Sequence, residues 1–472
     1  MMSGGRSVRT LVPLWMKTCY RYASSLINPY QKRIDRGEYR RTTALLAKTS
    51  SFDPEQLTGY QAAELRRLVN HCFESVPYYR RLFREIGIDP GDVSSPADLV
   101  RIPLLDKERV REILPELLSE RFTPKQRHFE STGGTSGTPL LFYSRKGYSS
   151  QREVAFWHDL AGRTGYRPGN RLAVLRNDAL PGKHLFVYNP RICQLILDPF
   201  KLNPGNVGRY IEAMRSYGTR FLHTYPSGAT VLLKFAAEAG IDAWGILKAV
   251  LCASENVYEG QREFIEERTG ARFFSFYGHS EKLVLAGECE YSTGYHSYPE
   301  YGILELVDGA GRPVTSPGIR GEIVGTGFNN PVMPLLRYRT GDFAEWAADQ
   351  DCPCGRHHPI MIDVAGRWLQ EMVLGRSGAR ISITSINMHT DAFNRVRKFQ
   401  FVQKERGKLI LNIMKNDDFT ESDAAAIRSA ILGKVKGELD LELDFVDGIP
   451  TTGRGKHRFL IQELPMEETG SR

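Results

Sequence analysis

A stretch of glycines and hydroxyl residues offers the first chemistry in this sequence. Residues 131–139 read STGGTSGTP. Glycine lets the backbone approach a ligand closely and adopt positive φ, and successive backbone N–H groups beside hydroxyls can bind an anion. A flexible surface loop would have a similar composition. No Gly-Lys-Ser/Thr ends the stretch, so it indicates a nucleotide-phosphate loop outside the P-loop NTPase fold. The candidate residues are Ser131, Thr132, Gly133, Gly134, Thr135, Ser136, Gly137 and Thr138.

An aromatic run ends in a second candidate. Residues 273–281 read FFSFYGHSE, which predicts a strand that ends at Tyr277 and Gly278. In open α/β sheets, ligands bind beyond the carboxyl ends of the strands. The Tyr277 ring could stack on a base there, and the Glu281 carboxylate could bind Mg²⁺. The alternative is that residues 273–281 form an ordinary junction between a strand and a loop, which could have the same sequence.

Two further motifs place single charges in glycine-containing segments. YRTGD at 338–342 puts the Asp342 carboxylate in a predicted turn, where it suits a ribose diol. TTGRGK at 451–456 puts Lys456 in a loop, from which an ammonium group can reach a phosphate or carboxylate and withdraw. The alternatives are a common turn and a solvated lysine.

Four soft ligands occur in two pairs. Three thiolates and one imidazole are a ligand set for structural zinc, and the residues are Cys289, His296, Cys352 and Cys354. The spacings are not those of a common zinc finger, so four unrelated residues remain an alternative. His357 and His358 are competing ligands.

Composition bounds the class of protein. With 472 residues, 41% hydrophobic and 25% charged, two or three soluble globular domains are expected. Seven cysteines are too few for a disulfide scaffold, so a cytoplasmic location fits. Residues 1–50 carry the whole net charge of +8, and the remainder is balanced, which argues against a nucleic-acid partner. The basic segment also contains apolar residues. It suits either peripheral contact with an anionic membrane or a frayed terminal helix.

Hydrophobic periodicity predicts an α/β protein. Residues 51–120 are expected to be helical, with a break at Val76-Pro77. Short apolar runs then alternate with helical stretches; the predicted strands are 172–175, 221–225, 249–253, 272–276 and 302–307, and residues 318–327 are predicted to form a hairpin turn and a strand. A strand, a helix and a strand at 408–414, 422–439 and 441–446 predict a small α+β unit. We therefore expect a basic segment 1–50, a large mixed α/β domain 51–366 and a small C-terminal domain 367–472.

Together, these motifs resemble the adenylate-forming superfamily of acyl-CoA synthetases. The resemblance is greatest to the phenylacetate-CoA ligase branch, with its capsular polysaccharide (CapK) and coenzyme F390 synthetase relatives. The similar segments are 71–80 (HCFESVPYYR), 102–107 (IPLLDK), 223–227 (HTYPS), 254–255, 329–342 and 447–456.

The resemblance implies a role for each motif. The loop 131–139 would hold the ATP phosphates, with Thr132 counted among the catalytic residues. The adenine pocket would be formed by Tyr277, Gly278, Ser254 and Glu255.

The resemblance also implies roles for the charged groups of the site. Glu281 would bind Mg²⁺, and Asp342 would bind the ribose near Arg367. Lys456 would swing in with a mobile C-terminal lid and bridge the acid and the α-phosphate. Some members of the branch carry a similar set of cysteines, which favours the structural zinc.

The implied reaction forms an acyl-adenylate from a carboxylic acid and then transfers the acyl group to CoA, an amine or a sugar. At the hinge, however, Leu369 and Gln370 replace the usual acidic pair, which leaves the thioester step and the acceptor open. The alternatives are an adenylyltransferase that leaves AMP on its substrate and a non-catalytic binding module. Candidates for the acid pocket, or for ordinary core, are Trp157, His158, Arg176, Tyr225 and Phe276.

Overall fold

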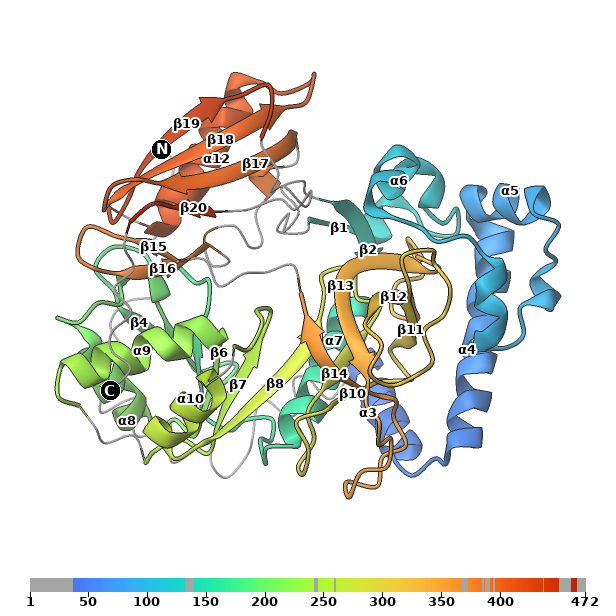
Figure 1. Cartoon of the computed structure of the whole chain (residues 1–472), viewed down its shortest axis with the longest axis horizontal. Helices are drawn as coiled ribbons and strands as arrows, with labels where there is room; N and C mark the ends of the chain where they lie inside the picture. Colours follow the sequence, from blue (N-terminus) through green and yellow to red (C-terminus); the bar gives the residue numbers. More distant parts are fainter. Residues whose placement is uncertain are drawn as a thin grey trace, which may run out of the picture.

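The computed structural model describes residues 37–131, 140–241, 245–258, 260–366, 372–383, 386, 391–393, 395–435, 437–449 and 460–464. It has a large α/β body and a smaller C-terminal unit (Figure 1). This architecture confirms the predicted fold class. Among the described residues, no helix combines the length and apolar content needed to cross a bilayer.

Helices form the first part of the body. Helix α4 begins after Asp53, which forms a capping box with Gln56, and it ends at Ser75. The backbone of Val76 is extended, as expected before a proline, so the predicted break at Val76-Pro77 is confirmed. The helices are α3 (Gly37–Thr49), α4 (Pro54–Ser75), α5 (Pro77–Glu85) and α6 (Lys107–Glu112), with 3-10 turns at Pro90–Asp92, Pro96–Arg101, Leu114–Leu117 and Pro124–Gln126.

A 12-stranded mixed sheet organises the body, in the order β11-β12-β13-β14-β10-β9-β8-β7-β6-β3-β5-β4. Strands β5, β3, β6, β7 and β8 run parallel, and the other pairings are antiparallel. Its strands are β3 (Leu172–Leu175), β4 (Phe186–Asn189), β5 (Gln194–Leu197), β6 (Phe221–Thr224), β7 (Ala249–Ala253), β8 (Arg272–Gly278), β9 (Leu285–Gly287), β10 (Tyr295–Ser297), β11 (Gly302–Val307), β12 (Gly321–Gly327), β13 (Tyr338–Trp346) and β14 (Ile360–Ala365).

Helices cover both faces of the parallel strands. Helices α8 (Val207–Tyr217), α9 (Pro226–Glu238) and α10 (Gln261–Thr269) pack on one face, and α7 (Tyr148–Gly162) packs on the other with α3. In β7, for example, Val250 belongs to the first core and Leu251 to the second. Because both faces are covered, these strands consist of continuous apolar runs. Such runs allowed the strands to be predicted from the sequence.

A two-stranded ribbon flanks the predicted phosphate loop. Strand β1 (Arg127–Ser131) pairs antiparallel with β2 (Leu141–Arg145), with Ser131 opposite Leu141. The intervening residues 132–139 lie outside the described part of the chain.

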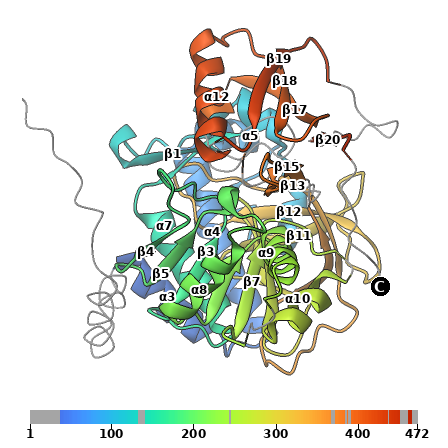
Figure 2. The same ribbon diagram turned by 90° about the vertical axis from the view of Figure 1, so that its left-hand side faces the viewer.

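The C-terminal unit has its own sheet and core. The sheet order is β19-β18-β17-β20, and α12 packs against it; the elements are β15 (Met372–Leu374), β16 (Arg380–Ser382), η6 (Asp391–Phe393), β17 (Val396–Gln403), β18 (Lys408–Lys415), α12 (Glu421–Val435), β19 (Asp440–Phe445) and β20 (Leu460–Gln462). The predicted strand-helix-strand order is confirmed. Figure 2 shows this unit above the large sheet, as in Figure 1.

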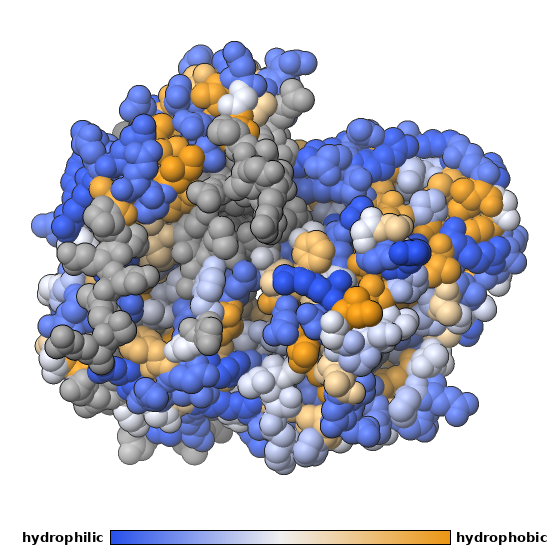
Figure 3. All heavy atoms as spheres, viewed as in Figure 1, coloured by the Kyte–Doolittle hydropathy of each residue, from blue (hydrophilic) through white to orange (hydrophobic). Residues whose placement is uncertain are grey.

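The C-terminal unit contacts the body through η5 (Pro199–Lys201). Phe200 is fully buried and belongs to the core of the C-terminal unit. The predicted boundary at 366–367 stays a prediction, because residues 367–371 are not described. On the face shown in Figure 3, the described residues are mostly hydrophilic, and hydrophobic ones form small separate groups. Most apolar side chains therefore belong to the internal cores.

Candidate active site

The parallel strands bring predicted site residues to one edge of the sheet. Arg176 directly follows β3, Tyr225 follows β6, and Ser254 follows β7, while Tyr277 and Gly278 end β8. Because β3, β6, β7 and β8 are parallel neighbours, their carboxyl ends lie side by side. This edge is where ligands bind in open α/β sheets.

Tyr277 and Asp342 come from distant segments and meet at this edge. The Tyr277 hydroxyl donates a hydrogen bond to Asp342 Oδ2 at 2.9 Å. Burial and the nearby Asp342 charge raise the pKa of the Tyr277 phenol, so it remains a donor at neutral pH. The predicted adenine and ribose residues are therefore in direct contact.

The prediction that Asp342 lies in a turn is wrong. Asp342 lies within strand β13, at a bulge. In the pairing of β12 with β13, Val324 lies opposite Arg339 and Glu322 lies opposite Phe343. The three residues 340–342 of β13 therefore lie opposite the single residue Ile323 of β12. The Thr340 hydroxyl donates to the Ile323 carbonyl at 2.7 Å and so fixes the bulge. A bulge redirects a side chain within a strand, and the glycine before Asp342 has φ +73°, so this segment resembles a turn in sequence.

Glu281 is held in its ionised form. Its Oε1 accepts a hydrogen bond from the Tyr338 hydroxyl at 2.9 Å, and its Oε2 lies 3.2 Å from His279 Nδ1. Although burial opposes the charge, the hydrogen bond from His279 and the charge of Lys107 lower the pKa of Glu281 to about 2. The Val284 N–H donates to His279 Nε2, so Nδ1 carries the proton that points at Glu281.

The turn after Glu281 is tied to the ribbon that flanks the phosphate loop. Lys282 has φ +60°, and its Nζ lies 2.6 Å from Glu130 Oε2. Glu130 lies in β1, next to Ser131, and also accepts a hydrogen bond from Ser144 in β2. The predicted phosphate loop therefore starts beside the carboxylate predicted to bind Mg²⁺.

Ser254 and Glu255 occupy the end of β7 with different partners. Glu255 accepts hydrogen bonds from the Ser227 N–H at 3.1 Å and the Ser227 hydroxyl at 3.0 Å, at the start of α9. The positive end of a helix dipole stabilises a carboxylate there. Ser254 has φ +70°, and its hydroxyl accepts a hydrogen bond from Arg176 at 3.0 Å. Glu255 thus fixes the strand end, whereas Ser254 contacts Arg176.

Several predicted site residues lie outside the described residues. They are Thr132, Gly133, Gly134, Thr135, Ser136, Gly137, Thr138, Arg367, Leu369, Gln370 and Lys456. The start of the predicted hinge is described: the Asn256 side chain donates to the Gly366 carbonyl at 3.2 Å and accepts from its N–H at 2.8 Å. The chain therefore leaves the body beside the end of β7.

The four predicted zinc ligands converge. Their ligand atoms all lie within 4.8 Å of one another, and they belong to Cys289, His296, Cys352 and Cys354. Cys289 follows β9, His296 lies in β10, and the other two lie in the segment between β13 and β14. The backbone N–H groups of residues 291 and 292 donate to Cys289 Sγ at 3.3 and 3.2 Å.

The histidine in this cluster is buried without a partner. His296 is fully buried, and neither ring nitrogen has a hydrogen-bond partner among the described residues. Burial, with the nearby Arg163 and Arg356 charges, lowers its pKa to about 4, which leaves the neutral imidazole that binds metals. The competing His358 is also buried near the cluster, with its ring 5.4 Å from the Tyr298 ring, but is not one of the four converging residues.

Sequence reasoning missed three residues that organise the site. His279 polarises Glu281, Lys282 joins it to β1, and His223 contacts Arg176. His279 lies in the motif GHSE and His223 in the motif HTYPS, so both residues could have been selected from these motifs as candidates. Their partners lie far along the chain, however, and only the fold reveals those contacts.

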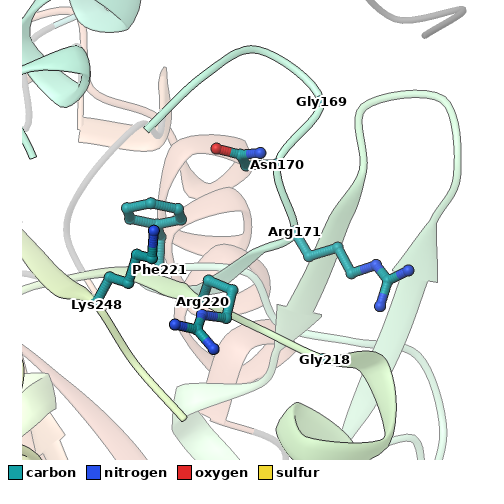
Figure 4. Close-up of a pocket in the computed structure, with 7 residues that line it drawn as sticks. All are labelled: Gly169, Asn170, Arg171, Gly218, Arg220, Phe221 and Lys248. Carbon is teal, nitrogen blue, oxygen red and sulfur yellow. The ribbon is translucent and has the colours of Figure 1, made fainter. Parts of the chain in front are cut away.

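A separate open pocket lies at the opposite edge of the sheet. It has a volume of about 550 Å³ and is lined by Gly169, Asn170, Arg171, Gly218, Arg220, Phe221 and Lys248. Figure 4 shows the Arg171 side chain pointing away from those of Arg220 and Lys248, and Arg171 donates to the Tyr217 carbonyl at 3.0 Å. The three cations therefore do not converge on one point. The pocket also lies before β3, β6 and β7, away from the candidate active site.

The relatives of this chain indicate the class of an adenylate-forming ligase. Residues 373–463 match the family model described as the CapK C-terminal domain. Phenylacetate-coenzyme A ligase from Thermus thermophilus is 28% identical over 322 residues, which cover 66% of this chain and 71% of that protein. Protein CapK from Staphylococcus aureus is 21% identical over 86% of this chain and 89% of its own length.

Solved structures support the fold. The structure of 2-hydroxyisobutyryl-CoA ligase in the postadenylation state, in complex with 2-HIB-AMP, has a TM-score of 0.57 and 20% identity. The match covers 88% of this chain and 92% of that one. The chain is similar to the branch of the adenylate-forming superfamily that contains the phenylacetate-CoA ligases and CapK, which is the resemblance that the sequence motifs predicted.

Proposed function

We propose that this protein uses ATP to convert a carboxylic acid into an acyl-adenylate with release of pyrophosphate, and then transfers the acyl group to CoA. The observation that carries the proposal is the meeting of Tyr277, Asp342 and Glu281 beside the ribbon that flanks the glycine-rich loop. An acid oxygen attacks the α-phosphorus, and the bond to pyrophosphate breaks. The acceptor then attacks the acyl carbon, and AMP leaves.

The nucleotide side of the site follows from two contacts. Asp342 offers a carboxylate oxygen to the ribose hydroxyls, and its bond to Tyr277 holds the carboxylate in place. The Tyr277 ring and Gly278 would lie against adenine. Ser254 and Glu255 end the adjacent strand, where Glu255 fixes the backbone of the adenine pocket through Ser227.

Glu281 would hold Mg²⁺ on the phosphate chain. Its pKa of about 2 keeps the carboxylate anionic at any physiological pH, and a single carboxylate with phosphate oxygens is a common magnesium ligand set. Bound magnesium would neutralise charge on the leaving pyrophosphate. Among the described residues, Tyr338 and His279 orient the Glu281 carboxylate.

The remaining catalytic roles rest on the family resemblance. The loop 131–139, with Thr132, would bind the β- and γ-phosphates. Arg367 would lie near the ribose, and Lys456 would bridge the acid and the α-phosphate. Positioning and neutralisation of charge would supply the catalysis.

The cysteine cluster would hold one structural zinc. Three thiolates and a neutral imidazole within 4.8 Å form a closed four-ligand set. The metal would join the segment after Glu281 to the segment between β13 and β14, so its loss should lower stability before it alters the chemistry. Metal analysis of chelator-washed protein should find one zinc per chain. A protein without stoichiometric zinc, and with an unchanged melting temperature after Cys352→Ser, would contradict the proposal.

One observation favours a second candidate acceptor. The match to CapK covers 86% of the chain, whereas the match to the Thermus ligase covers 66%, and the C-terminal unit matches the CapK model. A sugar or amine acceptor in polysaccharide synthesis is therefore the alternative to CoA. Residues 1–36 are not described, so contact of the basic segment with a membrane stays a prediction.

The proposal is tested by measuring pyrophosphate release from ATP with a panel of carboxylic acids. Mass analysis of the product separates an acyl-CoA from an adenylylated substrate or an acylated amine or sugar. If nucleotide binds but no acid supports pyrophosphate release, the protein is a binding module rather than a ligase.

A further inference from the structure

The turn that follows β8 carries two adjacent side chains of opposite charge, Glu281 and Lys282. Glu281 contacts Tyr338 and His279, whereas the Lys282 ammonium lies 2.6 Å from Glu130 Oε2. Lys282 has φ +60°, a backbone conformation that residues other than glycine rarely adopt. Such strained residues persist only where the surrounding structure fixes them, and they cluster at functional sites. The turn therefore directs its two charges to different partners.

Glycines of the neighbouring strands hold this turn in place. Leu283, the residue after Lys282, is 1% exposed. A Cβ atom at Gly302 of β11 would overlap the Leu283 carbonyl oxygen. A Cβ atom at Gly325 or Gly327 of β12 would lie 2.8 or 2.6 Å from the Leu283 side chain. The strands can approach the turn this closely only because these positions are glycine. The sheet therefore fixes the position of the turn.

The ion pair joins this fixed turn to the ribbon of β1 and β2. Glu130 lies in β1 opposite Phe142 of β2, and its second carboxylate oxygen accepts a hydrogen bond from the Ser144 hydroxyl. Phe142 is buried in the same core as Leu283. The side chains of Lys282 and Glu130 are 16% and 22% exposed, so solvent ions screen the pair less than a pair on the surface. One ion pair and one shared core therefore tie the ribbon to the turn.

The pair also balances charge beside the residues proposed to bind phosphate. Without Lys282, Glu130 would be an unpaired carboxylate at the start of the predicted phosphate loop, and it would repel a triphosphate. Glu153 of α7 lies nearby: burial raises its pKa, and the charges of Lys282 and Glu130 act on that pKa in opposite directions. The Tyr301 hydroxyl donates a hydrogen bond to Glu153 at 2.6 Å. Lys282 is therefore the cation that faces the carboxylates under the ribbon.

We propose, on the basis of the nucleotide site proposed above, that Lys282 is a positioning residue for the β- and γ-phosphates of ATP. Its ion pair with Glu130 holds the start of the phosphate loop against the Glu281 turn, so that one triphosphate reaches both. Because the ammonium is paired with Glu130, Lys282 acts through the ribbon and not by contact with the nucleotide. Binding of adenosine and the α-phosphate does not depend on this pair.

The test measures equilibrium binding of MgATP and of AMP to the full chain without any acid. AMP lacks the β- and γ-phosphates, so the ratio of the two Kd values reports the phosphates that Lys282 would position. Lys282→Met keeps a side chain of similar length but removes the ammonium. The Kd for MgATP should rise on the order of tenfold, the loss of one hydrogen bond to a charged group. The Kd for AMP should stay the same, which also shows that the variant is folded.

A second variant separates positioning from direct contact. Glu130→Met breaks the same ion pair and leaves Lys282 free to reach a phosphate. If Lys282 acts through the ribbon, Glu130→Met should also weaken MgATP binding, and the double variant should bind no more weakly than Lys282→Met, because both changes remove one interaction. Glu130→Met carries the test if Lys282→Met does not fold.

The matched control is Lys201→Met. Lys201 is paired with Asp198, and its side chain is 15% exposed, close to the value for Lys282. It lies in η5, away from the ribbon. Lys201→Met should therefore leave the ratio of the Kd values for MgATP and AMP unchanged, even if it lowers stability.

Three outcomes would overturn the inference. Unchanged MgATP binding in either single variant would do so. Tighter MgATP binding in Glu130→Met would show that Lys282 contacts the phosphates itself. Equal weakening of MgATP and AMP would show a general structural role. If the wild-type protein binds neither nucleotide, the proposed function fails and this inference fails with it. If nucleotides bind but no acid supports pyrophosphate release, only the ligase function fails, because the binding measurements decide the role of Lys282.

Discussion

Two adjacent residues of β8 face two different parts of the site. Tyr277 packs with the core that includes residues of β9 and β12 and bonds to Asp342. Phe276 packs on the other face of the sheet, against the core under α7, and lies near His223. One strand therefore divides the proposed nucleotide side from the proposed acid side.

The two sides differ in what fixes them. On the nucleotide side, Asp342 is held by a hydrogen-bonded bulge and Glu281 by Tyr338 and His279, so each functional oxygen has a defined position. On the acid side, Arg176 donates to His223 and Ser254 and lies 4.5 Å from the centre of the Tyr225 ring. The two sides therefore differ in charge, because carboxylates lie on the proposed nucleotide side and a guanidinium lies on the proposed acid side.

The largest effect is expected at Lys456, which would serve both sides. Lys456→Ala should lower the rate of adenylate formation by on the order of 10²–10³, roughly 3–4 kcal/mol, because one oriented charge stabilises the transition state. ATP binding should persist, since the interaction forms mainly in the transition state. Pyrophosphate exchange with each accepted acid measures the rate, and nucleotide binding is measured separately.

The matched control for Lys456 is Arg454→Ala, which removes a charge from the same glycine-containing segment. Equal losses in the two variants would indicate a general effect of charge. A loss confined to one acid would place Lys456 on the acid side alone.

The second effect should be confined to the nucleotide side. Asp342→Ala removes the proposed ribose contact, and a hydrogen bond to a charged group contributes about 1.5–3 kcal/mol. The KM for ATP should therefore rise roughly 10- to 100-fold, while the ranking of acids stays the same. Asp349→Ala, at an exposed carboxylate just beyond β13, should change neither. A changed ranking of acids in Asp342→Ala would break the separation between the sides.

Sequence reasoning succeeded where local patterns carry the information. The buried parallel strands are continuous apolar runs, and the predicted ranges 172–175 and 249–253 coincide with β3 and β7. The convergence of Cys289, His296, Cys352 and Cys354 was expected because three thiolates and an imidazole are a ligand set for zinc.

Other features depend on pairing between distant segments. Asp342 was assigned to a turn because the preceding glycine is typical of one, yet the register between β12 and β13 makes it a bulge. The contact between Arg176 and Ser254 is equally non-local: the two residues are 78 positions apart and meet only because β3, β6 and β7 are aligned. Local sequence contains no signal for such contacts.

A matched pair of substitutions on one strand sharpens the comparison further. Tyr277→Phe removes the hydroxyl that holds Asp342, so the KM for ATP should rise about fivefold, the effect of about 1 kcal/mol. Phe276→Leu changes the shape of the opposite face and should alter kcat/KM for the acid by roughly tenfold. Steady-state kinetics with each substrate varied in turn separates the two. If each variant changes the KM for ATP and kcat/KM for the acid to the same extent, β8 does not divide the site.

The smallest effect concerns the charge of Glu281 and appears as a dependence of stability on pH. The pKa of this group is about 2 in the folded protein, against an ordinary value of 4.5. The folded state is therefore stabilised above pH 4.5, and that contribution is lost as the pH falls toward 2. Between pH 5 and pH 4, the free energy of unfolding should fall by roughly 0.7 kcal/mol more in the wild type than in Glu281→Gln. Urea denaturation of nucleotide-free protein at the two pH values measures this difference.

Glu345→Gln, on β13, makes the same chemical change away from His279 and should not reproduce the difference. Identical pH dependence in the wild type and in Glu281→Gln would mean that Glu281 titrates normally in the folded protein. The contacts with Tyr338 and His279 would then not hold an ionised carboxylate, and the nucleotide side would lose its preformed charge. In that case the contrast in charge between the two sides of β8 would rest on Asp342 alone.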